Sequence, residues 1–132
     1  WAGLIRTPEL SIALMDEWEA KIESLAQSTI EEDVTSIAGV PTWTLVLLKR
    51  ILELTGKKSI KEVWPNFELY IHGGVSFTPY KEQFKKIIGA DCNFLEIYNA
   101  SEGFFAAQDN VKEEGMLLFL EHGIFYILNC LI

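Results

Sequence analysis

The spacing of apolar residues predicts three helices along the chain. Large apolar side chains recur every three or four residues between Leu14 and Leu25, with Glu and Lys between them, which predicts an amphipathic helix from about Pro8 to Ile30. The segment TWTLVLLKRILELTG is apolar on nearly all sides, follows a proline and ends at Gly56, so it predicts a second helix. TPYKEQFKKIIG, with its Thr-Pro start and glycine stop, predicts a third.

Short apolar runs between these helices predict strands, which we place in VTSIAGV, FELYIHGG and CNFLEIY. The later segment GMLLFLEHGIFYILN alternates around His122 and Gly123 and predicts a C-terminal β-hairpin. Strands separated by helices of this length favour an α/β fold with a mostly parallel sheet, flanking helices and the hairpin as an antiparallel addition. No repeat or linker interrupts residues 1–132, so we expect a single domain.

Composition and charge exclude several classes of protein. The chain is 49% hydrophobic, enough to build a core, and its net charge of -8 disfavours nucleic-acid binding. The longest strongly apolar run, Leu45–Leu48, is far shorter than a membrane span, so we expect a cytoplasmic protein without membrane contact. Cys92 and Cys130 lack a second ligand at metal-binding spacing, and we expect buried thiols and no structural zinc.

The two ends of the chain are unusual for a complete domain. The sequence begins at Trp1 without an initiator methionine and stops in the apolar run YILNCLI. Two interpretations follow: the chain is a central fragment of a longer polypeptide, or these ends are buried against a partner. Exposed apolar edges would in either case predict a homo-oligomer.

A glycine pair follows the second predicted strand. In open parallel sheets, ligands bind outside the carboxyl ends of the strands. Gly73 and Gly74 lie at such an end, where they would let the backbone approach a flat ligand closely. The alternative is an ordinary turn between a strand and a helix, for which glycine pairs are common.

The next strand ends in a second group of chemically useful residues, within IYNASEGFFAAQD. Tyr98 could stack on an aromatic base, Asn99 and Ser101 could donate hydrogen bonds to phosphate oxygens, and Glu102 offers the oxygen ligand that Mg²⁺ prefers. The alternative is that Asn99 and Ser101 cap a turn and Glu102 is solvated. Two such loops after adjacent strands favour a binding site.

These segments carry a resemblance to a known family. YNASE resembles the Tyr-x-x-Ser/Thr-Glu motif of the adenylate-forming superfamily, HGGVSFTPYKEQF its glycine-rich adenine loop, and VTSIAGVPTW its strand-turn-helix element. Three longer segments are most similar in sequence to bacterial members of the Gretchen Hagen family, the auxin-responsive acid-amido synthetases known from plants. These segments are GLIRTPE, EVWPNFELYIHGGVSFTPY and IYNASEGFFAAQD. The similarity runs from Gly3 to about Tyr126, and it implies part of the N-terminal domain of an adenylate-forming enzyme.

The resemblance implies a site for ATP and Mg²⁺. Tyr98 would lie against adenine, Ser101 would meet the α-phosphate region and act in catalysis with Glu102, and Glu102 would bind Mg²⁺. The remaining nucleotide-binding residues it implies are Gly73, Gly74, Val75, Asn99 and Ala100.

The implied reaction is that of an ATP-dependent acid-amido ligase. A small carboxylic acid attacks the α-phosphorus of ATP to give an acyl-adenylate and pyrophosphate, and an amine such as an amino acid then takes the acyl group. Phe104 and Phe105, which directly follow the motif, would line the acyl pocket or pack beneath the loop.

The chain also departs from that family. Its phosphate loop, its ribose-binding aspartate and its C-terminal subdomain have no counterpart here, so we expect a fragment that does not catalyse adenylation alone. The alternative is a noncatalytic remnant or an oligomerising module. His72 and His122 are expected to be structural hydrogen-bonding residues rather than general bases. Three tryptophans, Trp18, Trp43 and Trp64, are expected to be core or interface anchors.

Overall fold

Five strands form one mixed sheet in the computed structural model, which describes residues 8–89, 91–113 and 115–126. The first three strands run parallel and the last three are antiparallel neighbours, in the order β1-β2-β3-β4-β5. The predicted α/β class is confirmed, although the sheet is mixed rather than mostly parallel. The strand bounds are β1 Ser36–Gly39, β2 Leu69–Gly73, β3 Asn93–Ala100, β4 Gly103–Ala107 and β5 Leu117–Leu118.

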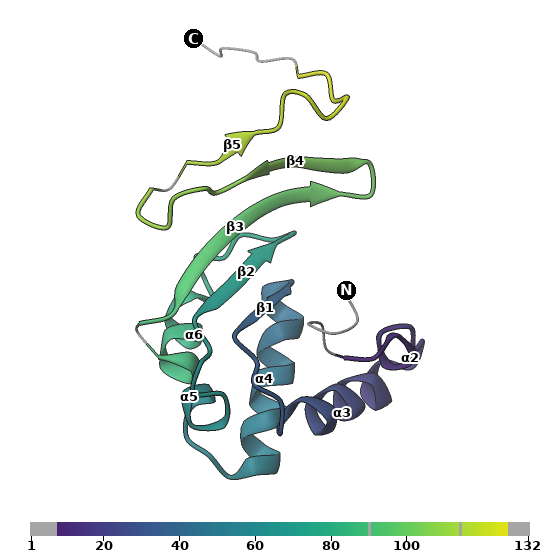
Figure 1. The fold of residues 1–132 in the computed structure, drawn as a ribbon, viewed down its shortest axis with the longest axis vertical. Helices are drawn as coiled ribbons and strands as arrows, with labels where there is room; N and C mark the ends of the chain where they lie inside the picture. Colours follow the sequence, from purple (N-terminus) through teal and green to yellow (C-terminus); the bar gives the residue numbers. More distant parts are fainter. Residues whose placement is uncertain (1–7, 90, 114, 127–132) are drawn as a thin grey trace.

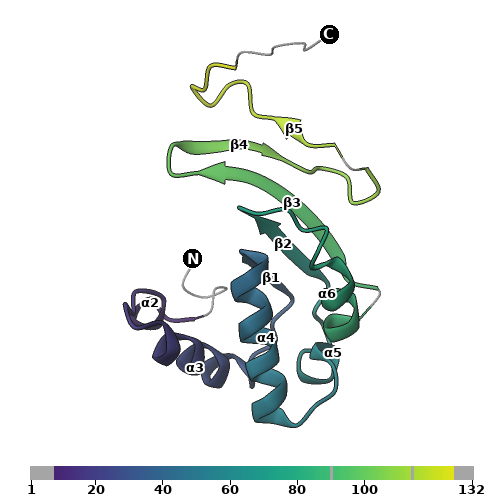
Figure 2. The ribbon, with the colours of Figure 1, turned by 180° about the vertical axis from the view of Figure 1, so that it is seen from behind.

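The helices gather around the parallel half of the sheet, while β4 and β5 extend beyond them (Figure 1). The view from behind shows the same division (Figure 2). Within the described residues, no helix is both long enough and apolar enough to cross a bilayer. The helices are α2 Leu10–Ala13, α3 Trp18–Thr29, α4 Pro41–Thr55, α5 Ile60–Val63 and α6 Lys81–Ile88.

Helix α4 forms as its sequence predicts, because both of its ends carry local signals. Pro41 occupies the first turn, where its missing N–H has no intrahelical partner to lose. Gly56 ends the helix in the left-handed conformation, with φ 65°, and its N–H donates to the carbonyl of Leu52 at 2.9 Å. The buried side of α4 includes Leu48 and Ile51, both fully shielded from solvent.

The core lies between one face of the parallel strands and helices α3 to α6. Tyr70 of β2 stacks on Phe84 of α6, with ring centroids 4.6 Å apart and an angle of 5° between the planes. Its hydroxyl donates to the carbonyl of Gly39 on β1 at 2.9 Å, and burial raises the pKa of Tyr70 to about 12. Phe94 of β3, the register partner of Tyr70, packs against the same cluster.

Trp64 connects two helices at the base of this core. It follows α5, is 1% exposed, and its indole N–H donates to the carbonyl of Thr29 at the end of α3 (2.8 Å). Its ring also packs on Phe67, with centroids 5.8 Å apart. The prediction that Trp64 is a core anchor is confirmed.

The single helix predicted from Pro8 to Ile30 is wrong, because the chain forms two helices there. The apolar period continues through residues 14–17, but Glu17 accepts hydrogen bonds from the N–H groups of Glu19 and Ala20 and so begins α3 afresh. At the end of α2, the carbonyl of Ala13 accepts a hydrogen bond from the Lys21 ammonium at 2.6 Å. Polar capping therefore divides the segment.

The predicted C-terminal hairpin around His122 and Gly123 is also misplaced. The antiparallel addition is instead formed by β3, β4 and β5, and residues 119–126 adopt turns and irregular structure. Residues 127–129 of the predicted hairpin lie outside the described residues. The hydroxyl of Tyr126 donates to the carbonyl of Phe105 at 2.8 Å, which fixes this segment against β4 by a side chain rather than by strand pairing.

Candidate functional site

An open pocket of about 240 Å³ lies at the carboxyl ends of β2 and β3. These two strands are parallel neighbours in register, so their ends and the residues that follow lie side by side (Figure 1). Four residues of the predicted nucleotide site line the pocket together: Gly74, Val75, Tyr98 and Asn99. The structure thus joins the glycine loop to the start of the YNASE motif.

The two glycines are required for different physical reasons. Gly73 is the buried last residue of β2, and a Cβ atom there would collide with the carbonyl oxygen of Ile97 on β3. It would also come within 3.3 Å of the side-chain oxygen of Asn99. Gly74 has φ 82°, a conformation that side chains disfavour, and it turns the chain out of the sheet.

Tyr98 provides an exposed aromatic surface at the pocket. Its side chain is 55% exposed, and behind it lies Phe105 of β4, with ring centroids 5.0 Å apart. The register between β3 and β4 shifts here, because Tyr98 pairs with Ala106 whereas Asn99 pairs with Phe104. Phe105 is therefore the extra residue of a β-bulge. It packs against Tyr98, whereas Phe104 is half exposed.

The YNASE segment is a strand and a tight turn rather than a loop, which corrects the sequence-based interpretation. Ala100 is the last residue of β3 and pairs with Gly103, so Ser101 and Glu102 alone form the connection to β4. All three of Ala100, Ser101 and Glu102 are exposed, and they are not among the residues that line the pocket. No group of three His, Cys, Asp or Glu residues gathers as a metal site in the described part of the chain.

Sequence reasoning missed four residues of the pocket: Ser76, Glu96, Ile97 and Met116. Glu96 had a usable signal, because it lies two positions before Tyr98 and alternate residues of a strand share one face. Met116 lies next to β5, far along the chain, and no local pattern pointed to it.

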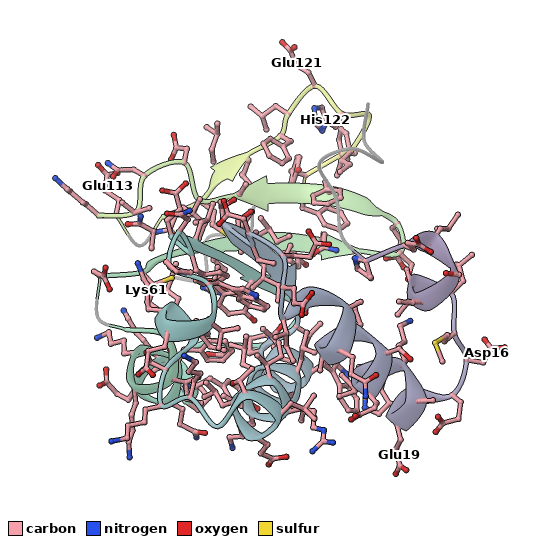
Figure 3. All side chains as sticks on the ribbon, turned by 60° about the horizontal axis from the view of Figure 1, so that its bottom comes forward. Asp16, Glu19, Lys61, Glu113, Glu121 and His122 are labelled. Carbon is pink, nitrogen blue, oxygen red and sulfur yellow. The ribbon has the colours of Figure 1, made fainter. Side chains whose placement is uncertain are left out.

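His72 lies directly before the glycine pair and is 3% exposed. Burial, and to a lesser extent the positive charge of Lys81, lowers its pKa from 6.5 to about 4, so the imidazole is neutral at pH 7. His122, by contrast, is exposed near the C-terminal side of the sheet, where its ring stacks on Phe119 (Figure 3). The two histidines therefore occupy very different environments.

Acid should destabilise the fold through His72. The pKa of His72 is lower in the folded chain, about 4, than its ordinary value of 6.5 in the unfolded chain. The unfolded chain therefore binds a proton first as the pH falls, so the free energy of unfolding is unaffected above pH 6.5 and decreases as the pH falls toward about 4. The decrease in the free energy of unfolding should reach at most about 3 kcal/mol. Urea unfolding between pH 7 and 4.5 measures it, and His72→Phe should remove most of the slope. An unchanged slope in that variant would contradict the assignment to His72.

Several other predicted residues lie away from the pocket. Cys92 is buried, and burial raises the pKa of its thiol to about 11, which keeps it protonated and unreactive at neutral pH. Cys130 lies outside the described residues. Trp18 and Trp43 form a partly exposed pair, with ring centroids 4.2 Å apart, where α3 begins beside α4.

Comparison with known families assigns the chain. Residues 1–92 match the model of the GH3 family N-terminal domain, which covers more than half of the sequence. The chain belongs to the GH3 family. No curated protein matches the chain.

The family match supports the resemblance seen in the motifs. GH3 is the Gretchen Hagen family of adenylate-forming acid-amido synthetases, so this GH3 chain is related to enzymes of the ligase type. The matched residues hold β1, α4, β2 and the glycine loop with Gly73, Gly74 and Val75. Tyr98 to Glu102 lie beyond the match. Tyr98 and Asn99 line the pocket, whereas the roles predicted for Ala100, Ser101 and Glu102 rest on the motif alone.

Proposed function

We propose that this GH3 chain supplies the adenine-binding and magnesium-binding side of an adenylating site. The whole site would activate a small carboxylic acid with ATP and transfer it to an amine such as an amino acid. One observation carries the proposal: the pocket at the ends of β2 and β3 brings the glycine loop next to the aromatic face of Tyr98. We also propose that residues 1–132 are a central part of a larger adenylating domain.

The pocket suits a flat aromatic base. Tyr98 offers its exposed ring for stacking, and the glycine loop lets backbone groups approach the edge of a base. Asn99 adds an amide that can both donate and accept hydrogen bonds. We propose that the base lies between Tyr98 and Val75 and that its phosphates extend toward the turn after β3.

Glu102 is suited to hold Mg²⁺ together with phosphate oxygens. It lies in the exposed turn that follows Tyr98 and Asn99 on the same strand, and its carboxylate has no hydrogen-bond or ion-pair partner among the described residues. Because Mg²⁺ keeps several waters and needs only one or two protein carboxylates beside substrate phosphates, a single glutamate is sufficient. The bound ion would neutralise charge on the phosphates.

The chain's own residues would bind and orient rather than exchange protons. In the proposed reaction, a carboxylate oxygen of the acid forms a bond to the α-phosphorus as the bond to the pyrophosphate oxygen breaks. The amine nitrogen then bonds to the acyl carbon, loses a proton, and AMP leaves. Ser101, beside Glu102, would donate its hydroxyl hydrogen to an α-phosphate oxygen as charge develops there.

Removing the Glu102 carboxylate should abolish the magnesium dependence of ATP binding. In a calorimetric titration, we expect Glu102→Gln to weaken ATP binding in the presence of Mg²⁺ by about tenfold to a hundredfold, the effect of losing one charged contact. Both proteins should bind ATP equally weakly when EDTA removes the metal.

Glu121→Gln is the matched control, because Glu121 is an exposed glutamate on the far side of β5 (Figure 3). It should bind ATP and Mg²⁺ as the unmodified chain does. Equal binding by Glu102→Gln and the unmodified chain would contradict the metal assignment. Absence of any binding in the unmodified chain would contradict the proposed function. Acid-dependent exchange of pyrophosphate into ATP tests the chemical step separately, and we expect none from residues 1–132 alone, because they form only part of the proposed site.

Self-association is a second candidate function, supported by apolar residues at the antiparallel edge. Leu117 and Leu118 of β5 are both exposed, and Phe125 nearby is almost fully so. A second copy that covers this edge would remove apolar surface from water. Sedimentation equilibrium decides between a monomer and a dimer.

A further inference from the structure

The glycine loop is closed at its base by two aromatic rings. After Gly73, the last residue of β2, residues 74–76 leave the sheet and lead to Phe77, whose side chain stacks on that of His72 with centroids 4.0 Å apart and 22° between the planes. Both side chains are buried. The stack therefore holds the two ends of the loop together, and Phe77 in turn precedes α6, where its carbonyl accepts hydrogen bonds from Tyr80 and Lys81.

The imidazole of His72 is incompletely bonded. Its Nδ1 atom is shielded from solvent and has no hydrogen-bond partner among the described residues. Glu96, its register partner on β3, makes no hydrogen bond to it, and the hydroxyl of neighbouring Tyr70 donates to Gly39 instead. An unsatisfied buried polar atom usually destabilises a protein, so its presence in a native fold requires an explanation.

Candidate partners for this nitrogen lie within the loop itself. The backbone N–H groups of Val75 and Ser76 make no hydrogen bond to other described residues. Gly74 has no side chain, so the backbone can adopt other conformations at this position than the observed one with φ 82°. A neutral imidazole can accept one hydrogen bond, and the environment of His72 keeps the ring neutral at pH 7.

We propose that His72 is a positioning residue for nucleotide binding, and this inference rests on the proposed function. When a nucleotide occupies the pocket, the loop folds onto it, and Nδ1 of His72 accepts a hydrogen bond from the N–H of Val75 or Ser76. The unsatisfied nitrogen destabilises the empty loop, and nucleotide binding relieves it. The residue acts through the loop and does not touch the base.

Two substitutions separate this role from simple packing. His72→Phe keeps the stack on Phe77 but removes the nitrogen, so we expect a melting temperature equal to or above that of the unmodified chain, with ATP binding weakened about fivefold to tenfold. His72→Asn places an acceptor oxygen close to the position of Nδ1, and it should restore most of the affinity. His122→Phe is the matched control and should change neither quantity.

A spectroscopic measurement tests the inference in the unmodified chain. The chain has two histidines, so the ¹⁵N resonance of His72 Nδ1 can be assigned by comparison with His72→Phe. It should shift when ATP is added, as the new hydrogen bond forms. A resonance that stays constant, or ATP affinity in His72→Phe equal to that of the unmodified chain, would overturn the inference while leaving the proposed function intact. Absence of ATP binding in the unmodified chain would overturn both.

Discussion

Replacing Trp64 by alanine is expected to destabilise the fold by about 3–5 kcal/mol, the largest effect of any single substitution proposed here. The indole is 1% exposed and fills the space between the end of α3 and the segment after α5. Its removal leaves a cavity and leaves the carbonyl of Thr29 without the indole donor, and these two losses add. Urea unfolding followed by far-ultraviolet circular dichroism measures the change.

Two variants separate the cavity from the hydrogen bond. Trp64→Phe keeps much of the apolar volume and loses the hydrogen-bond donor, so its free energy of unfolding should lie between those of Trp64→Ala and the unmodified chain. Trp43→Ala removes a tryptophan that is 50% exposed and should cost far less. If Trp64→Ala and Trp43→Ala were equally stable, the anchoring role of Trp64 would be wrong.

Replacing Gly73 by alanine is expected to impair both stability and ATP binding. The added methyl group would collide with the carbonyl oxygen of Ile97. This atom belongs to the backbone of β3, so it cannot move aside as a side chain could by rotating. Strands β2 and β3 would have to separate at the edge of the pocket, which should lower the free energy of unfolding by about 1–3 kcal/mol, the usual effect of overpacking. Since Gly74 directly follows β2 and Asn99 belongs to β3, and both line the pocket, the pocket would change shape and ATP binding should fall below detection in calorimetry.

Gly115→Ala is the matched control for this clash. An added Cβ at Gly115 meets nothing within 4 Å, and Gly115 does not have a positive φ. We therefore expect this variant to unfold and bind ATP as the unmodified chain does, or to be slightly more stable. Unchanged ATP binding by Gly73→Ala would show that the two strands tolerate the methyl group and that close backbone approach is not required.

Local signals explain which parts of the fold were predictable. Helix α4 has a proline at its first turn and a glycine after its last, and each signal acts within one turn of the chain. Strands β1, β2 and β3 are short apolar runs bounded by turn residues, so their positions were also predictable. The glycine loop and Tyr98 followed, because parallel strands end at one edge of the sheet.

The remaining features depend on a choice between competing local signals or on contacts between distant residues. Glu17 interrupts the first predicted helix by capping α3. The apolar periodicity does not show whether a helix begins near Pro8 and continues or begins again after Glu17. Strand β4 was missed because GFFAA follows a two-residue turn that resembled part of a binding loop. The extra residue at Phe105 and the place of Met116 in the pocket both depend on how β3, β4 and β5 align, which local patterns do not encode.

The length of β3 has a consequence for cooperativity. Its first five residues pair with β2 in the helix-covered half, and its last four pair with β4, so one strand is the only ladder link between the two halves within the described residues. The antiparallel half has few fully buried side chains of its own, chiefly Ala106. We therefore expect this half to open without unfolding the rest, which would place the aromatic face at Tyr98 in the less stable unit and the glycine loop in the more stable one. A ligand that bridges them would join two folding units into one.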